Sequence, residues 1–239
     1  MAVAGEHPED RLEALASLAE RTRRAVYAHV AAAGDWVSRD QVADALALGR
    51  GTAAHHLDRL AADGLLDVEY RRLSGRRGPG AGRPAKLYRR AGRDVAVSLP
   101  PRDYELAGAL LAAAADRART EGVAIDRALD EAARAEGRAV AAEVRRRLAA
   151  TGHEPGGGSR AALVAVLEDR GFEPRTGPDG TVMLRNCPFH RLARRHTELV
   201  CGMNLALLEA AVDGVGDTGL AARLEPEEGV CCVRLRPAG

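Results

Sequence analysis

Four cysteines near the C-terminus, with a histidine among them, are the residues best suited to metal or redox chemistry. The string CPFHRLARRHTELVC begins at Cys187 and ends at Cys201, with thirteen residues between the two thiols. Cys231 and Cys232 follow as an adjacent pair. Because thiolates and imidazoles bind zinc and iron strongly, these residue types predict a metal or cluster site. Its candidate ligands are Cys187, His190, Cys201, Cys231 and Cys232.

The spacing of these residues leaves several kinds of site open. The sequence has no compact Cys-x-x-Cys pair, and a free cysteine is often a small buried hydrophobic residue. A disulfide in a reducing compartment would serve only as a redox switch. His190 is the candidate fourth ligand of a tetrahedral site, whereas His196 is expected at a solvated helix start. Zinc, an iron–sulfur cluster, a thiol switch and inert packing are all compatible with the sequence.

Strand periodicity helps to choose between the two adjacent cysteines. In an extended chain, neighbouring side chains point to opposite faces. Cys231 would share a face with Val233, and Cys232 would share the other face with Arg234 and Arg236. We therefore expect Cys231 to be the inward ligand. The opposite assignment would place the Cys232 thiol beside two arginines, which would lower its pKa.

An enzymatic interpretation rests on the same residues. Cys187 with His190 or His196 could form a thiolate–imidazolium pair that acts as a nucleophile. No third orienting group or oxyanion hole is found at a recognisable spacing, and the sequence has neither an HExxH string nor a Walker glycine loop. We therefore expect this chain not to be an enzyme.

Basic residues are concentrated in one stretch of the N-terminal half. Between Arg71 and Arg93 there are eight arginines, one lysine and no acidic residue. Between Arg50 and Arg93 there are eleven basic and four acidic residues, so this stretch carries +7 in a chain whose net charge is +1. Such an uneven distribution favours binding to a polyanion such as nucleic acid.

Two short helices and a hairpin are predicted around this stretch. Ser38, with Gln41 three residues later, forms a capping-box pattern at a helix start. That helix would bury Val42, Ala45 and Leu46, and Gly49 lies in the break that follows, where an unusual backbone angle is easiest for glycine. A second helix is predicted over residues 50–62 and a strand over 65–70. The second helix would bury Ala53, Leu57 and Leu60.

The opposite face of the second helix carries polar and cationic side chains suited to base edges and phosphates. A solvated helix pair with a basic loop is the alternative, but the order of cap, break, helix, hairpin and basic loop favours double-stranded DNA as a partner. On the helices, the candidate contacts are Ser38, Arg39, Arg50, Thr52, His55, His56 and Arg59. In the loop between the strands, they are Arg76, Arg77 and Arg83.

The remaining patterns predict an α+β fold in three segments. Residues 1–95 form the DNA-binding domain and begin with one helix whose stripe runs from Leu15 to Val30. Residues 96–152 form a helical linker or dimerisation segment, in which Gly137 marks a kink or a close approach. Residues 153–239 form a mixed α/β domain after a glycine-rich linker, with helices near 159–170 and 197–212. Strands are expected around Phe172 and over 181–184, 220–224 and 230–235.

The location of the chain is predicted from two absences in the sequence. No run of eighteen or more apolar residues is present. The N-terminus lacks the basic region and apolar core of a secretory signal. We expect a cytoplasmic protein without membrane contact.

The stretch GTAAHHLDRLAADGLL, together with GRPAKLY at Gly82–Tyr88, resembles the winged-helix domain of bacterial ArsR-like regulators. The resemblance implies a homodimer that places two recognition helices in successive major grooves, with wing arginines near the minor groove or backbone. One departure is that the recognition region contains no cysteine. The thiolate metal site that some family members have there is therefore absent, and any sensor must lie elsewhere.

Cys187-Pro188-Phe189, then Cys201, then a late cysteine, resembles the C-terminal half of regulators that repress Suf iron–sulfur assembly genes, and small sensor domains of the 4-vinyl-reductase type. The resemblance implies three cysteines that hold an iron–sulfur cluster whose loss changes DNA affinity. We therefore expect a transcriptional regulator, acting as a repressor, with a cysteine-based sensor. The alternatives are a structural zinc and an apolar-ligand-binding C-terminal domain.

Overall fold

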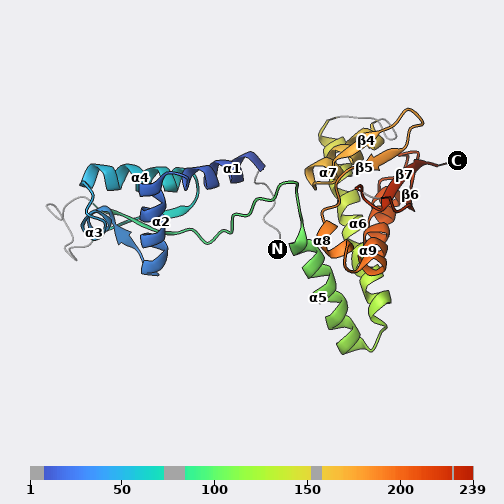
Figure 1. Cartoon of the computed structure of the whole chain (residues 1–239), viewed down its shortest axis with the longest axis horizontal. Coiled ribbons are helices and arrows are strands. Elements are labelled where there is room, and N and C mark those ends of the chain that lie inside the picture. The colour runs from blue at the N-terminus through green and yellow to red at the C-terminus, as the bar shows by residue number, and fades with distance from the viewer. Residues whose placement is uncertain (1–7, 73–83, 152–157, 228, 239) are drawn as a thin grey trace. The chain divides into compact units, whose positions relative to one another are not determined.

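The fold is taken from a computed structural model, which describes residues 8–72, 84–151, 158–227 and 229–238. The chain divides into two compact units, Met1–Val97 and Ser98–Gly239, and each is described by itself. Each unit combines helices with one small antiparallel sheet (Figure 1). The predicted α+β class is therefore confirmed. In the part of the chain that the structure describes, no helix is both long and apolar enough to cross a membrane.

The first unit packs short helices against a three-stranded sheet. Its helices are α1 (Pro8–Ser17), α2 (Arg21–Ala33), α3 (Arg39–Ala45) and α4 (Arg50–Ala62), and its strands are β1 (Val37–Ser38), β2 (Leu66–Arg71) and β3 (Ala85–Arg90). The sheet has the order β1-β3-β2, and β2 and β3 pair in register from Leu66 opposite Arg90 to Arg71 opposite Ala85. Its core holds Val26, Val30, Val42, Ala53, Leu57, Leu60 and Tyr88.

The single N-terminal helix that the sequence predicted is wrong, because the structure has α1 and α2 with a break between them. Glu20 causes the break. Its carboxylate accepts hydrogen bonds from the backbone N–H groups of Thr22 (2.7 Å) and Arg23 (2.6 Å) and so caps the start of α2. An apolar stripe can run across two helices without indicating that the backbone turns between them.

The α3–α4 connection follows the prediction in part. Ser38 caps α3 with the predicted capping box, and α4 has the predicted bounds. However, the positive backbone angle lies at Ala47 (φ 51°), whereas Gly49 is extended. Ala43 is buried in place of the predicted Ala45, because α3 ends at Ala45 and leaves that side chain exposed.

The second unit places long helices against a four-stranded sheet. Its helices are α5 (Tyr104–Glu121), α6 (Ile125–Ala150), α7 (Ser159–Asp169), α8 (His190–Ala193) and α9 (Thr197–Val215). Its strands are β4 (Pro174–Thr176), β5 (Val182–Leu184), β6 (Leu220–Leu224) and β7 (Val233–Pro237), in the antiparallel order β4-β5-β7-β6. One hydrophobic core contains side chains from both the helices and the sheet. The predicted boundary between a helical segment and a C-terminal domain is therefore not a boundary between compact units.

The apolar stripe of α6 lies in the segment predicted to serve as a linker or for dimerisation, and it is buried inside this unit. Leu129, Ala133, Val140 and Val144 belong to its core, and α6 packs along α9. Gly137 permits this packing, because a Cβ atom there would lie against the Leu207 carbonyl oxygen. Of the two roles predicted for Gly137, the close approach is confirmed. The stripe stabilises the unit and is not free for a partner chain.

Candidate functional site

The first candidate site is the outward face of α4. Thr52, His55 and Arg59 are exposed there, and Arg59 forms an ion pair with Asp63 at 3.1 Å. The opposite face of the helix, with Leu57 and Leu60, is fully buried. Because its apolar side is anchored, α4 presents these polar side chains on a rigid support.

Two arginines lie near the start of this helix. The side chains of Arg39 and Arg50 are 60% and 74% exposed, and their Nε atoms lie 3.7 and 3.3 Å from Asp40 Oδ1. Exposed ion pairs of this kind contribute little to stability. Both guanidinium groups can therefore exchange Asp40 for an anionic ligand at small cost.

Two predicted DNA contacts are used inside the unit instead. Ser38 Oγ accepts a hydrogen bond from the Gln41 backbone N–H, and Gln41 Oε1 accepts one from the Ser38 backbone N–H (2.8 Å). The side chain of His56 is only 12% exposed, and its Nδ1 lies 3.7 Å from Glu20 Oε2 at the start of α2. His56 therefore does not share the exposed face of Thr52, His55 and Arg59. The predicted loop contacts Arg76, Arg77 and Arg83 lie outside the described residues.

A polar clamp between α4 and β3 was not predicted from the sequence. Asp58 Oδ1 lies 2.5 Å from Lys86 Nζ and 2.7 Å from Tyr88 Oη. Lys86 and Tyr88 are two residues apart on β3, so their side chains leave the strand on the same side. That spacing could have indicated a shared face, but no local pattern indicates that the face meets Asp58.

Aromatic and acidic neighbours also hold other cations of the basic stretch. The Arg89 guanidinium lies over the Trp36 ring, 4.7 Å from its centroid, and 3.4 Å from Asp67 Oδ2. Arg71 pairs with Glu69 at 2.9 Å. Several charges that make this stretch basic are therefore ion-paired on the two strands.

The second candidate site is a cluster of four buried thiols in the core of the second unit. Cys187 follows β5, and the backbone N–H of Cys231 donates to the Leu184 carbonyl at the end of β5 (2.9 Å). Cys201 lies in the first half of α9. The carbonyl of Cys232 accepts a hydrogen bond from the Glu225 backbone N–H (2.7 Å). Sheet pairing and one helix thus bring together residues that are far apart in the sequence.

Burial and the interactions between the thiols together raise the pKa of Cys187, Cys201 and Cys231. The hydrogen bond with Cys231 and burial raise the pKa of Cys187. Hydrogen bonding with Cys187 lowers the pKa of Cys231, but hydrogen bonding with Cys232 and burial outweigh it and raise that pKa to about 12. Burial raises the pKa of Cys201 despite a hydrogen bond with Cys232. These directions are opposite to those of an activated cysteine nucleophile.

The residue types in this cluster suit a thiophilic metal, but their arrangement does not. Four thiols are the ligand type that zinc and iron–sulfur clusters use. Among the described residues, however, no three His, Cys, Asp or Glu side chains are placed so that they could hold one ion. The half-buried His190 begins α8, and its backbone N–H donates to the Cys187 carbonyl (3.0 Å). The predicted five-ligand set is therefore not assembled.

A buried amide lies against the thiols. Asn204, on α9 one turn after Cys201, is 1% exposed, and its Nδ2 donates to Cys231 Sγ at 3.3 Å. Its Oδ1 is buried without a hydrogen-bond partner among the described residues. An unsatisfied buried acceptor is unfavourable, so stability alone does not explain this residue. No local sequence pattern indicates this contact, because Asn204 and Cys231 are twenty-seven residues apart.

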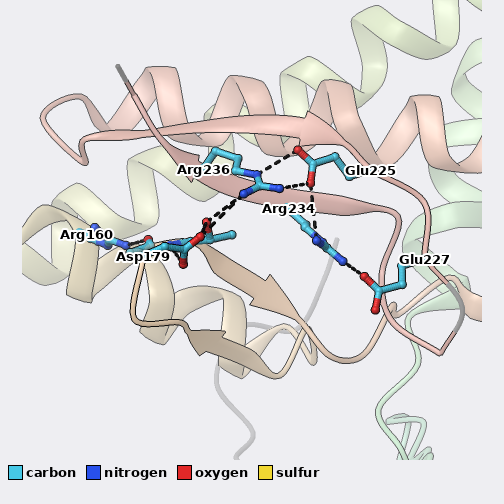
Figure 2. A network of polar contacts seen from close by, with 8 residues as sticks. Arg160, Asp179, Glu225, Glu227, Arg234 and Arg236 are labelled. Carbon is cyan, nitrogen blue, oxygen red and sulfur yellow. Dashed lines mark hydrogen bonds and ion pairs between the residues drawn. The ribbon is translucent and has the colours of Figure 1, made fainter.

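The loop that carries Cys231 and Cys232 is held by an ion network. β7 begins at Val233, so the expected strand alternation does not apply to the two cysteines. Arg236 binds Glu225 at 2.6 Å and lies 3.8 Å from Asp179, and Arg234 binds Glu227 (Figure 2). The two arginines therefore have carboxylate partners and fix the ends of this loop.

An open groove of about 780 Å³ lies between the start of α6 and the start of α9. Leu129, Leu199 and Met203 line it together with charged side chains such as Asp126 and Arg195. Sites for apolar ligands are lined mainly by hydrophobic side chains with few polar groups. The mixed lining therefore gives no specific support to an apolar ligand.

Comparison of the chain with protein-family models, with curated proteins and with solved structures found no match.

Proposed function

We propose that this chain is a sequence-specific DNA-binding transcriptional regulator of the ArsR-like winged-helix class. The observation that carries the proposal is α4, whose outward face offers Thr52, His55 and Arg59 while its inner face is buried. A helix of this kind can enter the major groove, where short polar side chains and arginine contact base edges. Arg39 and Arg50 would then contact phosphates.

The order of the elements supports this class. The pair α3 and α4 corresponds to the helix-turn-helix, with α4 as the recognition helix. The antiparallel strands β2 and β3 correspond to the wing, and the segment between them carries the proposed contacts Arg76, Arg77 and Arg83. Repression is the mode that the resemblance to Suf regulators implies.

The test is the salt dependence of binding to double-stranded DNA, measured by fluorescence anisotropy. Each lost phosphate contact should reduce the slope of log K against log salt by about 0.9. We expect this reduction for Arg50→Ala, and a more sequence-dependent loss of affinity for Arg59→Ala. Arg127→Ala is the matched control, because Arg127 on α6 is 75% exposed and ion-paired with Glu131. Equal slopes for Arg50→Ala and Arg127→Ala would contradict the proposal.

A homodimer on DNA is the second part of the proposal. A two-fold symmetric pair of reading heads matches half-sites about one helical turn apart. The stripe on α6 is already buried, so another surface would have to form the interface. Sedimentation of the chain with an operator fragment should give two chains per site, and one chain per site would contradict this part.

We further propose that the thiol cluster is the sensor of the regulator. Its support is the meeting of four thiols and Asn204 in one core, in a unit separate from α4. An iron–sulfur cluster or zinc would require the thiols to rearrange around a common centre. Iron, sulfide and zinc analysis of protein purified without oxygen tests this. Iron and sulfide in proportion indicate a cluster, and one zinc per chain indicates a structural metal. Metal-free protein that resists reconstitution leaves the thiols themselves as the sensor.

A further inference from the structure

Lys86 is the one lysine of the chain. Its ammonium group is held by the polar clamp between α4 and β3. Lys86 Nζ lies 2.5 Å from Asp58 Oδ1 and 5.4 Å from the centroid of the Tyr88 ring. The side chain of Lys86 is 34% exposed. A carboxylate and an aromatic face therefore both attract the ammonium group toward α4.

Asp58 occupies an unexpected place for an acidic residue on a DNA-binding helix. It lies next to Arg59 and one turn after His55, two residues of the outward face of α4. A carboxylate there repels phosphate unless a cation compensates its charge. In the structure the charge of Asp58 is compensated, because Asp58 is paired with Lys86 on β3.

Tyr88 makes the clamp more than an exposed ion pair. Tyr88 is 2% exposed, and its Oη donates to the same carboxylate oxygen at 2.7 Å. Partial burial opposes ionisation of Asp58, but the hydrogen bonds from Lys86 and Tyr88 outweigh it and lower the pKa of this carboxyl. Burial, followed by the hydrogen bond to Asp58, raises the pKa of Tyr88. The Asp58 carboxylate therefore has two partners. The buried Tyr88 fixes it to the core, and Lys86 pairs with it at the surface.

We propose that Asp58 limits the electrostatic affinity of the DNA-binding surface for DNA, because it withholds Lys86 from phosphate. This inference rests on the proposed function. Non-specific affinity grows with each phosphate that the protein neutralises, whereas specific affinity also depends on base contacts. Withholding one cation weakens the electrostatic part of the affinity, which supplies essentially all of the binding to random DNA and only a share of the binding to an operator.

The experiment compares salt slopes on random DNA for wild type, Asp58→Asn, Lys86→Gln and the double variant. Asp58→Asn should steepen the slope by about 0.9 and tighten random binding roughly threefold to tenfold at low salt, because Lys86 gains a phosphate. The double variant should return to the wild-type slope. Lys86→Gln alone should not steepen the slope, because it releases no cation and leaves the Asp58 carboxylate uncompensated. The matched control is Asp116→Asn, because Asp116 on α5 is 73% exposed and ion-paired with Arg119 at 2.8 Å; it should change nothing.

Two results would overturn the inference. A double variant with a slope as steep as that of Asp58→Asn would show that Lys86 is not the released cation. An unchanged slope for Asp58→Asn would show that no cation is released. Ultraviolet titration of the tyrosines tests the clamp without DNA, since Asp58→Asn should lower the pKa of one tyrosine; identical curves would also overturn it. Wild-type protein without salt-dependent DNA binding would instead remove the proposed function, and this inference with it.

Discussion

In the first unit the residues proposed to contact bases lie on the surface of one helix, whereas in the second unit the four thiols lie in the core. Thr52, His55 and Arg59 follow one another at helical spacing and are exposed. Cys187 and Cys231 come from distant segments and meet only because β5 and β7 pair. Surface chemistry on one helix is a local property, but chemistry in a core depends on the whole packing around it. The thiols should therefore be far more sensitive than α4 to changes in the packing of their unit.

The largest effect is expected from Gly137→Val, which would break the core that positions the thiols. The new side chain would meet the backbone of α9 at Leu207, so we expect a loss of about 2–3 kcal/mol in the free energy of unfolding. Gly108→Ala is the control, because a Cβ atom at Gly108 meets nothing within 4 Å; it should stabilise α5 by about 0.5–1 kcal/mol. Thermal unfolding measures both, and equal stability of the two variants would contradict the close packing of α6 on α9.

The next effect is a fall in stability of the second unit at alkaline pH. The pKa of Cys231 is raised from 9.0 to about 12 in the folded protein. Above pH 9 the unfolded chain therefore releases a proton that the folded chain retains. Stability should be complete below that pH and should fall as the pH rises toward 12. Denaturant unfolding between pH 7.5 and pH 10.5 tests this, with Cys231→Ser as the control that should fall less. A flat profile for wild type would show that the thiol is not buried as described.

A smaller change in the free energy of unfolding is expected at Asn204, and it distinguishes a functional buried amide from a structural one. Asn204→Leu should change the free energy of unfolding by no more than about 1 kcal/mol, because the unsatisfied Oδ1 is removed together with one hydrogen bond. Asn186→Leu is the matched comparison. The Asn186 amide donates to Pro101 and Gly171 carbonyls and accepts from Arg102, so its loss should cost about 2–3 kcal/mol. A larger loss at Asn204 than at Asn186 would make Asn204 a purely structural residue.

The smallest effect is expected at the ion network around the cysteine loop. Glu225→Gln removes the charge that binds Arg236 (Figure 2). Exposed networks of this kind contribute little to stability, and salt screens them. Unfolding at low and high salt should therefore differ between wild type and variant only at low salt. A loss that persists at high salt would assign the loop a packing role.

Much of the first unit could be predicted from its sequence because its signals are local. The capping box at Ser38 marked the start of α3, and the apolar spacing of Leu57 and Leu60 indicated α4. The break before α2 was missed because Glu20, which caps it, is not among the residues that usually occupy a helix N-cap. The clamp at Asp58 was missed because it joins residues thirty positions apart.

Prediction was weaker in the second unit, where contacts between distant segments decide the structure. A helical segment was expected over residues 96–152, but the apolar stripe of α6 within it could equally have faced a partner chain. Only the packing on α9 shows that the stripe is internal. The alternation argument for Cys231 and Cys232 failed because β7 begins one residue after them. Asn204 could not be found from spacing, since its role depends on a thiol twenty-seven residues away.

The comparison between the units is tested most directly by the DNA affinity of the full chain under reducing and oxidising conditions. Fluorescence anisotropy should be measured for wild type and for Cys187→Ser, with protein purified without oxygen. If buried thiols in one unit control the α4 surface of the other, wild-type affinity should change by about tenfold between the two conditions, within the usual range of allosteric coupling. Cys187→Ser should show one affinity in both. Equal wild-type affinities, or no measurable binding in either condition, would contradict the account.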